Sequence, residues 1–217
     1  MGIRFPLDIT DCHGPTALAM TWKIWRKLMQ LLFMGIFAAV AVGLDQLTKY
    51  LTVTNIAYTP PGTDTTITVE AIEKFLGAFG LTPAQSAALP STQPAVPGIF
   101  HFSHYLNDGA AWSMFEGEQW FFALIFALFT VGVIWEYKKK YFAFSTFERW
   151  CIAAVYAGGL GNMIDRVRMG YVVDMIQTEF MDFPIFNVAD CFITCGVIAL
   201  IFHLVFFNKA FWKDEKK

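Results

Sequence analysis

The stretch that decides the fold is LMQLLFMGIFAAVAVGLDQLTK, residues 28–49. Residues 28–44 carry no charge, and with one flanking turn this run reaches the roughly 20 residues that a helix needs to cross a bilayer. Asp45 follows the apolar run directly, at the place where a cleaved signal peptide would have small residues. The stretch therefore predicts a retained membrane-spanning helix.

The same pattern recurs along the chain, in charge-free apolar runs over residues 119–135, 150–164 and 191–208. Hydrophobic residues make up 56% of the 217 residues and charged residues only 16%, whereas a soluble domain carries about 25% charged residues. We therefore predict an integral membrane protein, mainly α-helical, with four transmembrane helices and a small extracytoplasmic β-containing subdomain. The predicted spans cover about residues 28–45, 118–136, 149–165 and 190–208.

A fifth uncharged stretch, residues 76–100, contains four prolines, and the backbone groups that they free could not be satisfied in lipid. We expect it to belong to an extracytoplasmic insert over about residues 52–100. Within the insert, TTITV at residues 65–69 predicts a short strand. The apolar residues between Ile72 and Phe79 fall on one helical face, and Thr82-Pro83 predicts the start of a second helix.

Charge sets the orientation. Twelve of the 16 basic residues lie in the N-terminal segment, in the connection between the second and third spans, and in the C-terminal tail. The positive-inside rule then places both termini in the cytoplasm. The predicted organisation is a cytoplasmic extension at residues 1–24, a membrane domain at 25–210 and a cytoplasmic tail at 211–217. The formal net charge of −2 offers no basic surface to nucleic acid.

Polar residues gather at the predicted outer ends of the spans. Asp45 and Lys49 are neighbours if the first helix continues past the apolar run. Asn162, Asp165 and Arg166 end the third span, after a run of glycines that would let another helix pack closely. A solvated ion pair and ordinary packing glycines would explain some of these residues, but not the three polar ones together.

Another polar group follows the alternating stretch at residues 100–106, which predicts a strand. Asn107 and Gly109 come next, within NDGAA, and an asparagine there could both donate to and accept from a peptide. Taken alone, this segment is better explained as a strand-to-helix turn in which Asn107 is the cap.

Two acids complete the set. Asp174 interrupts an apolar, strand-like run, and Asp190 lies in the first turn of the last span, where a capping role is the plain alternative. Both acids fall on the predicted outer face. Two carboxyl groups that converge at a lipid-bounded site can separate their pKa values, so that one activates water and the other protonates a carbonyl.

Five motifs in this order resemble the signal peptidase II (lipoprotein signal peptidase) family of aspartyl membrane proteases. They are DQLTK at 45–49, NDGAAWS at 107–113, GGLGNMIDR at 158–166, GYVVDMI at 170–176 and FPIFNVAD at 183–190. The chain departs from the family pattern in its longer segment before NDGAAWS and in Met175, where the family has Phe.

The resemblance implies an endopeptidase that removes signal peptides from prolipoproteins, cleaving just before the diacylglyceryl-modified cysteine. It implies that Asp174 and Asp190 are the catalytic pair. Substrate-binding or supporting roles fall on the other motif residues: Asn107, Gly109, Asn162, Arg166, Asn187, Asp45, Lys49 and Asp165. The implied setting is the bacterial cytoplasmic membrane, with lipids and lipidated prolipoproteins as partners, and with the site on the extracytoplasmic face.

Two other classes of protein compete with this interpretation. A transporter or channel would place charges near the middle of its spans, whereas these charges gather at one end. A structural assembly protein would not need two outward acids framed by asparagines. We also expect no metal and no cofactor, because His101 and His104 would face opposite sides of a strand and Cys191 and Cys195 are explained by helix packing.

Overall fold

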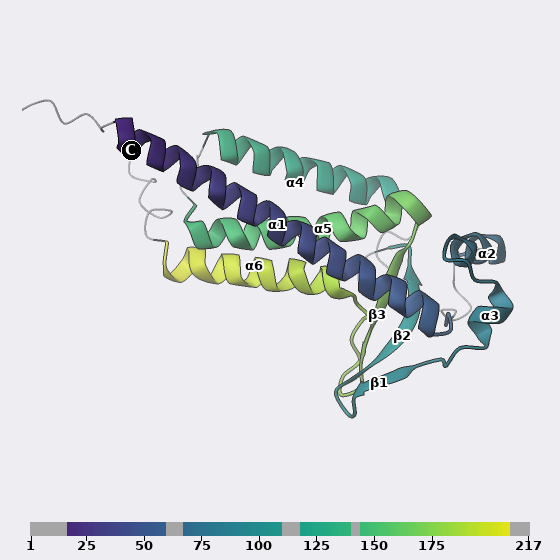
Figure 1. Cartoon of the computed structure of the whole chain (residues 1–217). Helices are drawn as coiled ribbons and strands as arrows, with labels where there is room; N and C mark the ends of the chain where they lie inside the picture. The colour runs from purple at the N-terminus through teal and green to yellow at the C-terminus, as the bar shows by residue number, and fades with distance from the viewer. Residues whose placement is uncertain (1–16, 60–66, 110–117, 140–143, 209–217) are drawn as a thin grey trace, which may run out of the picture. The chain divides into compact units, whose positions relative to one another are not determined.

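The computed structural model describes residues 17–59, 67–109, 118–139 and 144–208. Four long helices dominate it: α1 (Ala17–Asn55), α4 (Gln119–Lys139), α5 (Thr146–Met169) and α6 (Val188–Phe206). Two short helices, α2 (Val69–Ala78) and α3 (Pro83–Ala87), lie in the insert. The strands are β1 (Gln93–Val96), β2 (Phe100–Asn107) and β3 (Val172–Thr178) (Figure 1).

The chain divides into two compact units at residues 36 and 37, inside α1. The described part of the first unit is helical, and Trp22 and Trp25 stack there with their ring centroids 5.5 Å apart. The second unit holds the rest of α1, the other helices and the sheet. All the residues of the candidate site belong to this second unit.

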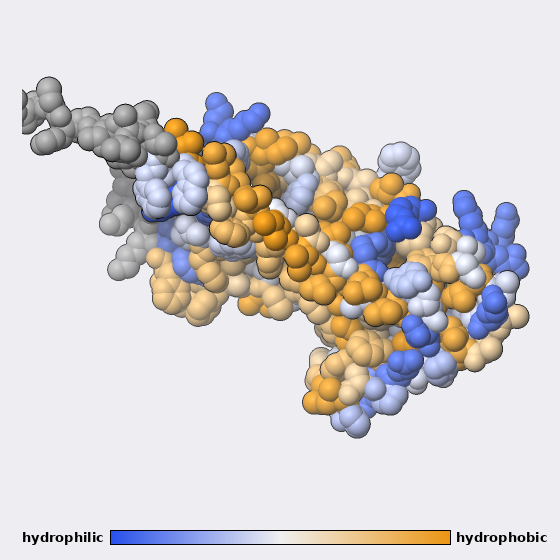
Figure 2. All heavy atoms as spheres, in the orientation of Figure 1, coloured by the Kyte–Doolittle hydropathy of each residue, from blue (hydrophilic) through white to orange (hydrophobic). Residues whose placement is uncertain are grey.

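Three of the helices are long and apolar enough to cross a membrane: residues 24–55 of α1, then α4 and α6. Hydrophobic side chains cover the visible face of α1 and α4, and hydrophilic ones gather over α2 (Figure 2). The predicted third span lies in α5, which is 24 residues long and carries charges near both of its ends. The finding is therefore a mainly helical membrane protein with three candidate spans and a small antiparallel sheet.

Glycines in α5 and α6 set how closely these helices approach. A Cβ atom on Gly158 would meet the carbonyl oxygen of Ala189 in α6, and one on Gly161 would lie 2.6 Å from Oδ2 of Asp45. A Cβ atom on Gly196 of α6 would likewise lie 2.8 Å from Cγ2 of Val155 in α5. Small residues let neighbouring backbones pack closely in lipid, so these positions bring the polar ends of three helices together.

The sheet has the order β1-β2-β3, and both strand pairs are antiparallel. Side chains alternate between its two faces. Asn107, Val172 and Asp174 line a cavity beside the helices. Leu106, Val173 and Met175 belong instead to a buried apolar cluster with residues of the insert. The sheet thus separates the cavity from the insert.

The predicted strand at 65–69 is wrong where the structure describes it, and Thr65 and Thr66 lie outside the described residues. Thr68 is the N-cap of α2, because its side chain accepts a hydrogen bond from the N–H of Ala71, and Val69 begins the helix. The predicted start at Thr82-Pro83 is confirmed: Thr82 and Gln85 form a capping box at the start of α3.

Candidate active site

Asp174 lies in the middle of β3 and is 3% exposed. Its Oδ2 accepts a hydrogen bond from Nδ2 of Asn107 at 2.8 Å, and its Oδ1 accepts one from Nδ2 of Asn187 at 2.7 Å. Asn107 ends β2, whose Tyr105 pairs directly with Asp174. The strand pairing therefore holds Asn107 diagonally across from the carboxylate, on the same face of the sheet.

Asp190 lies in the first turn of α6, but it is not the N-cap that its position suggested. The N-cap is Asn187, whose Oδ1 accepts from the N–H of Asp190 at 3.0 Å, while Oδ2 of Asp190 accepts from the N–H of Asn187 at 3.1 Å. The other carboxylate oxygen, Oδ1, accepts from Nδ2 of Asn162 at 2.7 Å. A capping box and an asparagine of α5 thus fix this acid.

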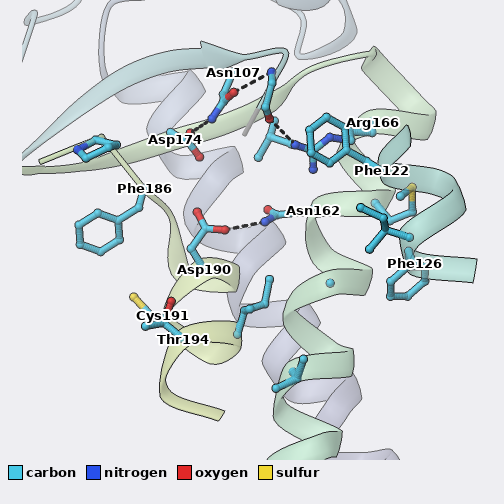
Figure 3. A pocket seen from close by; sticks show the side chains of 18 of the residues that line it. Asn107, Phe122, Phe126, Asn162, Arg166, Asp174, Phe186, Asp190, Cys191 and Thr194 are labelled. Carbon is cyan, nitrogen blue, oxygen red and sulfur yellow. Dashed lines mark hydrogen bonds between the residues drawn. The ribbon is translucent and has the colours of Figure 1, made fainter. Parts of the chain in front are cut away.

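A short return of the chain brings the two acids together. The carbonyl of Phe186 accepts from the N–H groups of Met175 and Ile176, at 3.0 and 2.8 Å, so the chain pairs with β3 just before α6 begins. Asn187 follows and contacts both carboxylates, one with its side chain and one with its backbone. In Figure 3 the side chains of Asp174 and Asp190 point toward one another.

This environment changes the proton affinity of Asp174. Burial, and then the nearby charge of Asp190, raise the pKa of Asp174 to about 7 from its ordinary value of 3.8, against the donors on Asn107 and Asn187. One carboxyl group of the pair can therefore keep a proton at neutral pH. This is the charge state that acid–base catalysis by two carboxyl groups requires.

A layer of buried charges lies behind the pair. Nζ of Lys49 lies 2.9 Å from Oδ2 of Asp45 and 2.7 Å from Oδ2 of Asp165, and it donates to Oδ1 of Asn162 at 3.0 Å. Lys49 is 2% exposed and both aspartates are 1% exposed, so the plain interpretation of Asp45 and Lys49 as a solvated ion pair is wrong. The lysine fixes the amide that orients Asp190.

Asp45 also connects α1 to α6, since its Oδ1 accepts from the N–H of Ala189 at 2.9 Å. A carboxylate at a helix N-terminus satisfies a free N–H and is favoured by the helix dipole. Gln46 strengthens the same junction: its Nε2 donates to Oδ1 of Asp165 at 2.8 Å and to the carbonyl of Gly161 at 3.2 Å. These contacts join α1, α5 and α6 around the candidate site.

Arg166 holds the segment after β2. Its Nη2 donates to the carbonyl of Gly109 at 2.7 Å, and the N–H of Gly109 donates to Oδ1 of Asn107 at 2.9 Å. The guanidinium carbon lies 4.1 Å from the ring centroid of Phe122 in α4. Arg166 therefore positions the Asn107–Gly109 segment, and the remaining edge of the guanidinium lines the cavity (Figure 3).

The cavity that the two acids face has a volume of about 840 Å³. Asp174, Asp190, Asn107 and Arg166 gather at one end of it. Its other walls are mainly apolar. They come from α4, α5 and α6, with side chains such as Phe122, Phe126, Phe129, Val155, Met163 and Ile193, and from the segment 183–186 that precedes α6. The arrangement suits a long apolar ligand with one polar, cleavable group.

The structure brings together every predicted site residue: Asp174, Asp190, Asn107, Gly109, Asn162, Arg166, Asn187, Asp45, Lys49 and Asp165. Sequence reasoning missed Gln46, although it lies inside the DQLTK motif, and Phe122, which an aromatic-rich span does not single out. No cluster of three or more His, Cys, Asp or Glu residues is placed to bind a metal ion within the described part of the chain.

A buried and a partly buried carboxyl group, framed by asparagines at the end of a helical membrane bundle, define a membrane hydrolase of the aspartic type. The sequence profile of the family described as signal peptidase (SPase) II matches residues 37–206. The chain belongs to this family and is an aspartic endopeptidase.

Individual relatives agree with the profile. The chain is 39% identical over 175 residues to a lipoprotein signal peptidase of Enterococcus faecalis, covering 81% of this chain and 89% of that protein. It is 44% identical over 115 residues to a lipoprotein signal peptidase of Lactococcus lactis, covering 52% and 73% of the two chains. A solved bacterial membrane enzyme superimposes with a TM-score of 0.59 at 28% identity, covering 85% of this chain and 93% of that chain.

Proposed function

We propose that the protein removes the signal peptide from prolipoproteins by hydrolysing the peptide bond just before the diacylglyceryl-modified cysteine, with Asp174 and Asp190 as the catalytic pair. The observation that carries the proposal is the double contact of Asn187, which donates to Oδ1 of Asp174 and to Oδ2 of Asp190. One residue thus holds two carboxyl groups at the polar end of an apolar cavity.

In the proposed mechanism the two carboxyl groups share one proton. The protonated carboxyl donates to the carbonyl oxygen of the scissile bond, while the ionised one removes a proton from the attacking water. The raised pKa of Asp174 favours this acid as the proton donor in the resting state. As the tetrahedral intermediate collapses, the carboxyl group that took a proton from water gives it to the leaving amine, and a hydroxyl of the intermediate returns a proton to the other carboxylate, so that the pair again holds one proton.

The residues around the pair would orient the substrate. The apolar walls from α4, α5 and α6 suit the hydrophobic segment of a signal peptide and the acyl chains of a lipidated cysteine. Asn107 and Arg166 lie at the polar end of the cavity, where their amide and guanidinium groups can hold the peptide backbone.

We also propose the membrane arrangement that the charges predict. In it α5 also crosses the membrane, as the third of four spans. Residues 25–210 form the peptidase domain around an extracytoplasmic insert at 52–100, and the short segments 1–24 and 211–217 are cytoplasmic. Thiol labelling tests this in a variant without native cysteines. An impermeant reagent added to intact cells should label Thr178→Cys and should not label Lys139→Cys, and the reverse result would overturn the orientation.

The reaction itself is tested with the purified protein in lipid and a diacylglyceryl-modified prolipoprotein. The expected product ends just before the modified cysteine, as mass spectrometry of both fragments would show. Addition of EDTA should leave the rate unchanged. Cleavage at another bond, equal cleavage of the unlipidated precursor, or loss of activity with the chelator would contradict the proposal.

A further inference from the structure

The insert between α1 and β2 has no part in the proposed reaction, yet it is built against the strand that carries Asp174. The core of the insert consists of Ile67, Phe75 and Leu76, and it joins Val53 of α1, Leu106 of β2, and Val173 and Met175 of β3 in one buried apolar cluster. Phe75 and Leu76 are 3% and 1% exposed. Helix α2 thus packs its buried side chains on the face of the sheet opposite the cavity.

Side chains of β3 alternate between the two faces of the sheet, so the two neighbours of Asp174 point toward α2. Val173 and Met175, the two neighbours of Asp174, are 0% and 1% exposed and belong to the cluster with Phe75. A change in how α2 packs acts on the side chains of these two residues. Because they flank Asp174 in the same strand, a shift of their backbone would also shift Asp174. Met175, where the family pattern has Phe, is part of this packing.

Hydrogen bonds inside the insert hold its segments together, and packing on His104 attaches the insert to β2. The N–H of Ala57 donates to the carbonyl of Pro90 at 2.9 Å, and the N–H of Tyr58 donates to Oγ of Ser86 at 3.2 Å. His104 of β2 is fully buried against the rings of Tyr58 and Phe75, at centroid distances of 5.6 and 6.0 Å. Burial lowers the pKa of His104 to about 4, so this packing stays uncharged at neutral pH.

We infer that helix α2, through Phe75 and Leu76, is a positioning element that presses Val173 and Met175 from behind and so holds Asp174 against its partners in the cavity. The inference rests on the proposed role of Asp174. It assigns the insert a function in catalysis at a distance, without contact with substrate.

A positioning role predicts a specific kinetic change. Misplacement of a reacting group by about 1 Å can cost about a hundredfold in rate, so Phe75→Ala should lower kcat about tenfold or more while KM changes less than about twofold. Water that reaches a loosened β3 should also lower the pKa of Asp174, since burial is the largest cause of its rise. The alkaline limb of the kcat profile should then move to lower pH.

Other charged and titratable groups that face Asp174 are unchanged in this variant. They are Asp190 of α6, Lys49 of α1, Arg166 of α5 and Tyr105 across the strand pair. A shift of the alkaline limb in Phe75→Ala would therefore report on the surroundings of Asp174 and not on the loss of a neighbouring charge.

The experiment compares the full-length variants Phe75→Ala, Phe75→Leu and Lys74→Ala in lipid, with a lipidated prolipoprotein as substrate. Lys74 is exposed on the same helix, so Lys74→Ala is the matched control and should behave as the parent. Phe75→Leu keeps most of the apolar volume and should recover most of kcat and of the pH profile. If Phe75→Ala does not fold, the milder truncation Leu76→Val provides the test, and it should lower kcat and move the alkaline limb in the same direction by a smaller amount.

A parent-like kcat and alkaline limb in Phe75→Ala would overturn the inference, as would a change confined to KM, which would mark α2 as a substrate-docking element. A lower melting temperature with an unchanged limb would also overturn it, because that result describes scaffolding alone. The Asp174→Asn variant is measured alongside. If it remains active, the proposed catalytic pair fails, whereas an inactive Asp174→Asn with an unaffected Phe75→Ala rejects only the role of α2.

Discussion

Helix α5 carries a buried polar cluster at each of its ends. One cluster supports the proposed catalytic pair, and the other joins helices. At its start, Glu148 is 0% exposed, and its two oxygens accept from His203, Asn208 and the N–H of Ser145. At its other end, Asn162, Asp165 and Arg166 support the pair formed by Asp174 and Asp190.

Both clusters satisfy their carboxylates with hydrogen bonds, so hydrogen bonding alone does not distinguish them. The cluster around Glu148 has one acid, whose Oε1 lies 2.8 Å from Nδ1 of His203, and Glu148 is fully buried. The other cluster has two acids that face each other, and they open on a cavity of about 840 Å³. Paired acids with access to a ligand are typical of an active site, whereas a single acid that is fully buried and hydrogen-bonded is typical of a helix junction.

The largest expected effect is on the pair itself. Asp174→Asn and Asp190→Asn should each abolish cleavage, because neither amide can exchange the proton that the reaction needs. Asp174→Asn keeps the neutral charge that the site favours, so it should still fold. Its stability should be somewhat lower, because the new amide nitrogen would face a donor of Asn107 or Asn187. Product formation by mass spectrometry and a thermal melt check both statements. Measurable turnover in either variant would mean that the acids at this end of α5 are not the catalytic pair.

Arg166 should show the next largest effect. Its planar group donates to the carbonyl of Gly109 and stacks on Phe122, and lysine cannot make both contacts. Losing one charge-assisted hydrogen bond costs about 1.5–3 kcal/mol, so Arg166→Lys should lower kcat/KM by about one to two decades. The rate at low substrate concentration measures this. A parent-like rate would mean that only the positive charge of Arg166 matters, and not its planar group.

The pH dependence sharpens the comparison further. Because the pKa of Asp174 is raised to about 7, its proton, and the stability that the neutral form contributes, should be lost as pH rises through this value. Cleavage should fall in the same window. Asn107→Ala removes a donor that lowers this pKa, so its residual activity should decline at a higher pH than that of the parent. A shift in the opposite direction would count against Asp174 as the group that titrates.

The smallest effect on cleavage should come from the closed end. Glu148→Ala removes the carboxylate that accepts from the Asn208 amide and from the N–H of Ser145, and loss of the acceptor of a buried donor costs about 1–3 kcal/mol. The melting temperature should fall clearly, while the rate for each folded molecule stays near that of the parent. Melting curves and activity normalised to the folded fraction provide the check. A large loss of kcat would mean that this end, too, serves the reaction.

Local pattern was enough for much of the fold, as particular elements show. The apolar runs predicted α1, α4 and α6 with errors only at their ends, because an apolar helix in lipid needs little else to be stable. Thr82-Pro83 predicted the start of α3, because a cap acts over one turn. The strand predicted at 65–69 was wrong where the structure describes it, because Thr68 caps a helix whose apolar face is buried by tertiary packing.

By itself, the sequence determined the membrane class and the motif residues, and it predicted two acids on one face, since charge, hydropathy and motif order do not depend on distant contacts. Only the tertiary structure decided that Lys49 lies between Asp45 and Asp165, that Asn187 contacts both acids, and that α2 lies behind β3. These contacts join segments more than a hundred residues apart in places. They form only where the glycines of α5 let helices meet and where strand alternation sends Asp174 and Met175 to opposite faces.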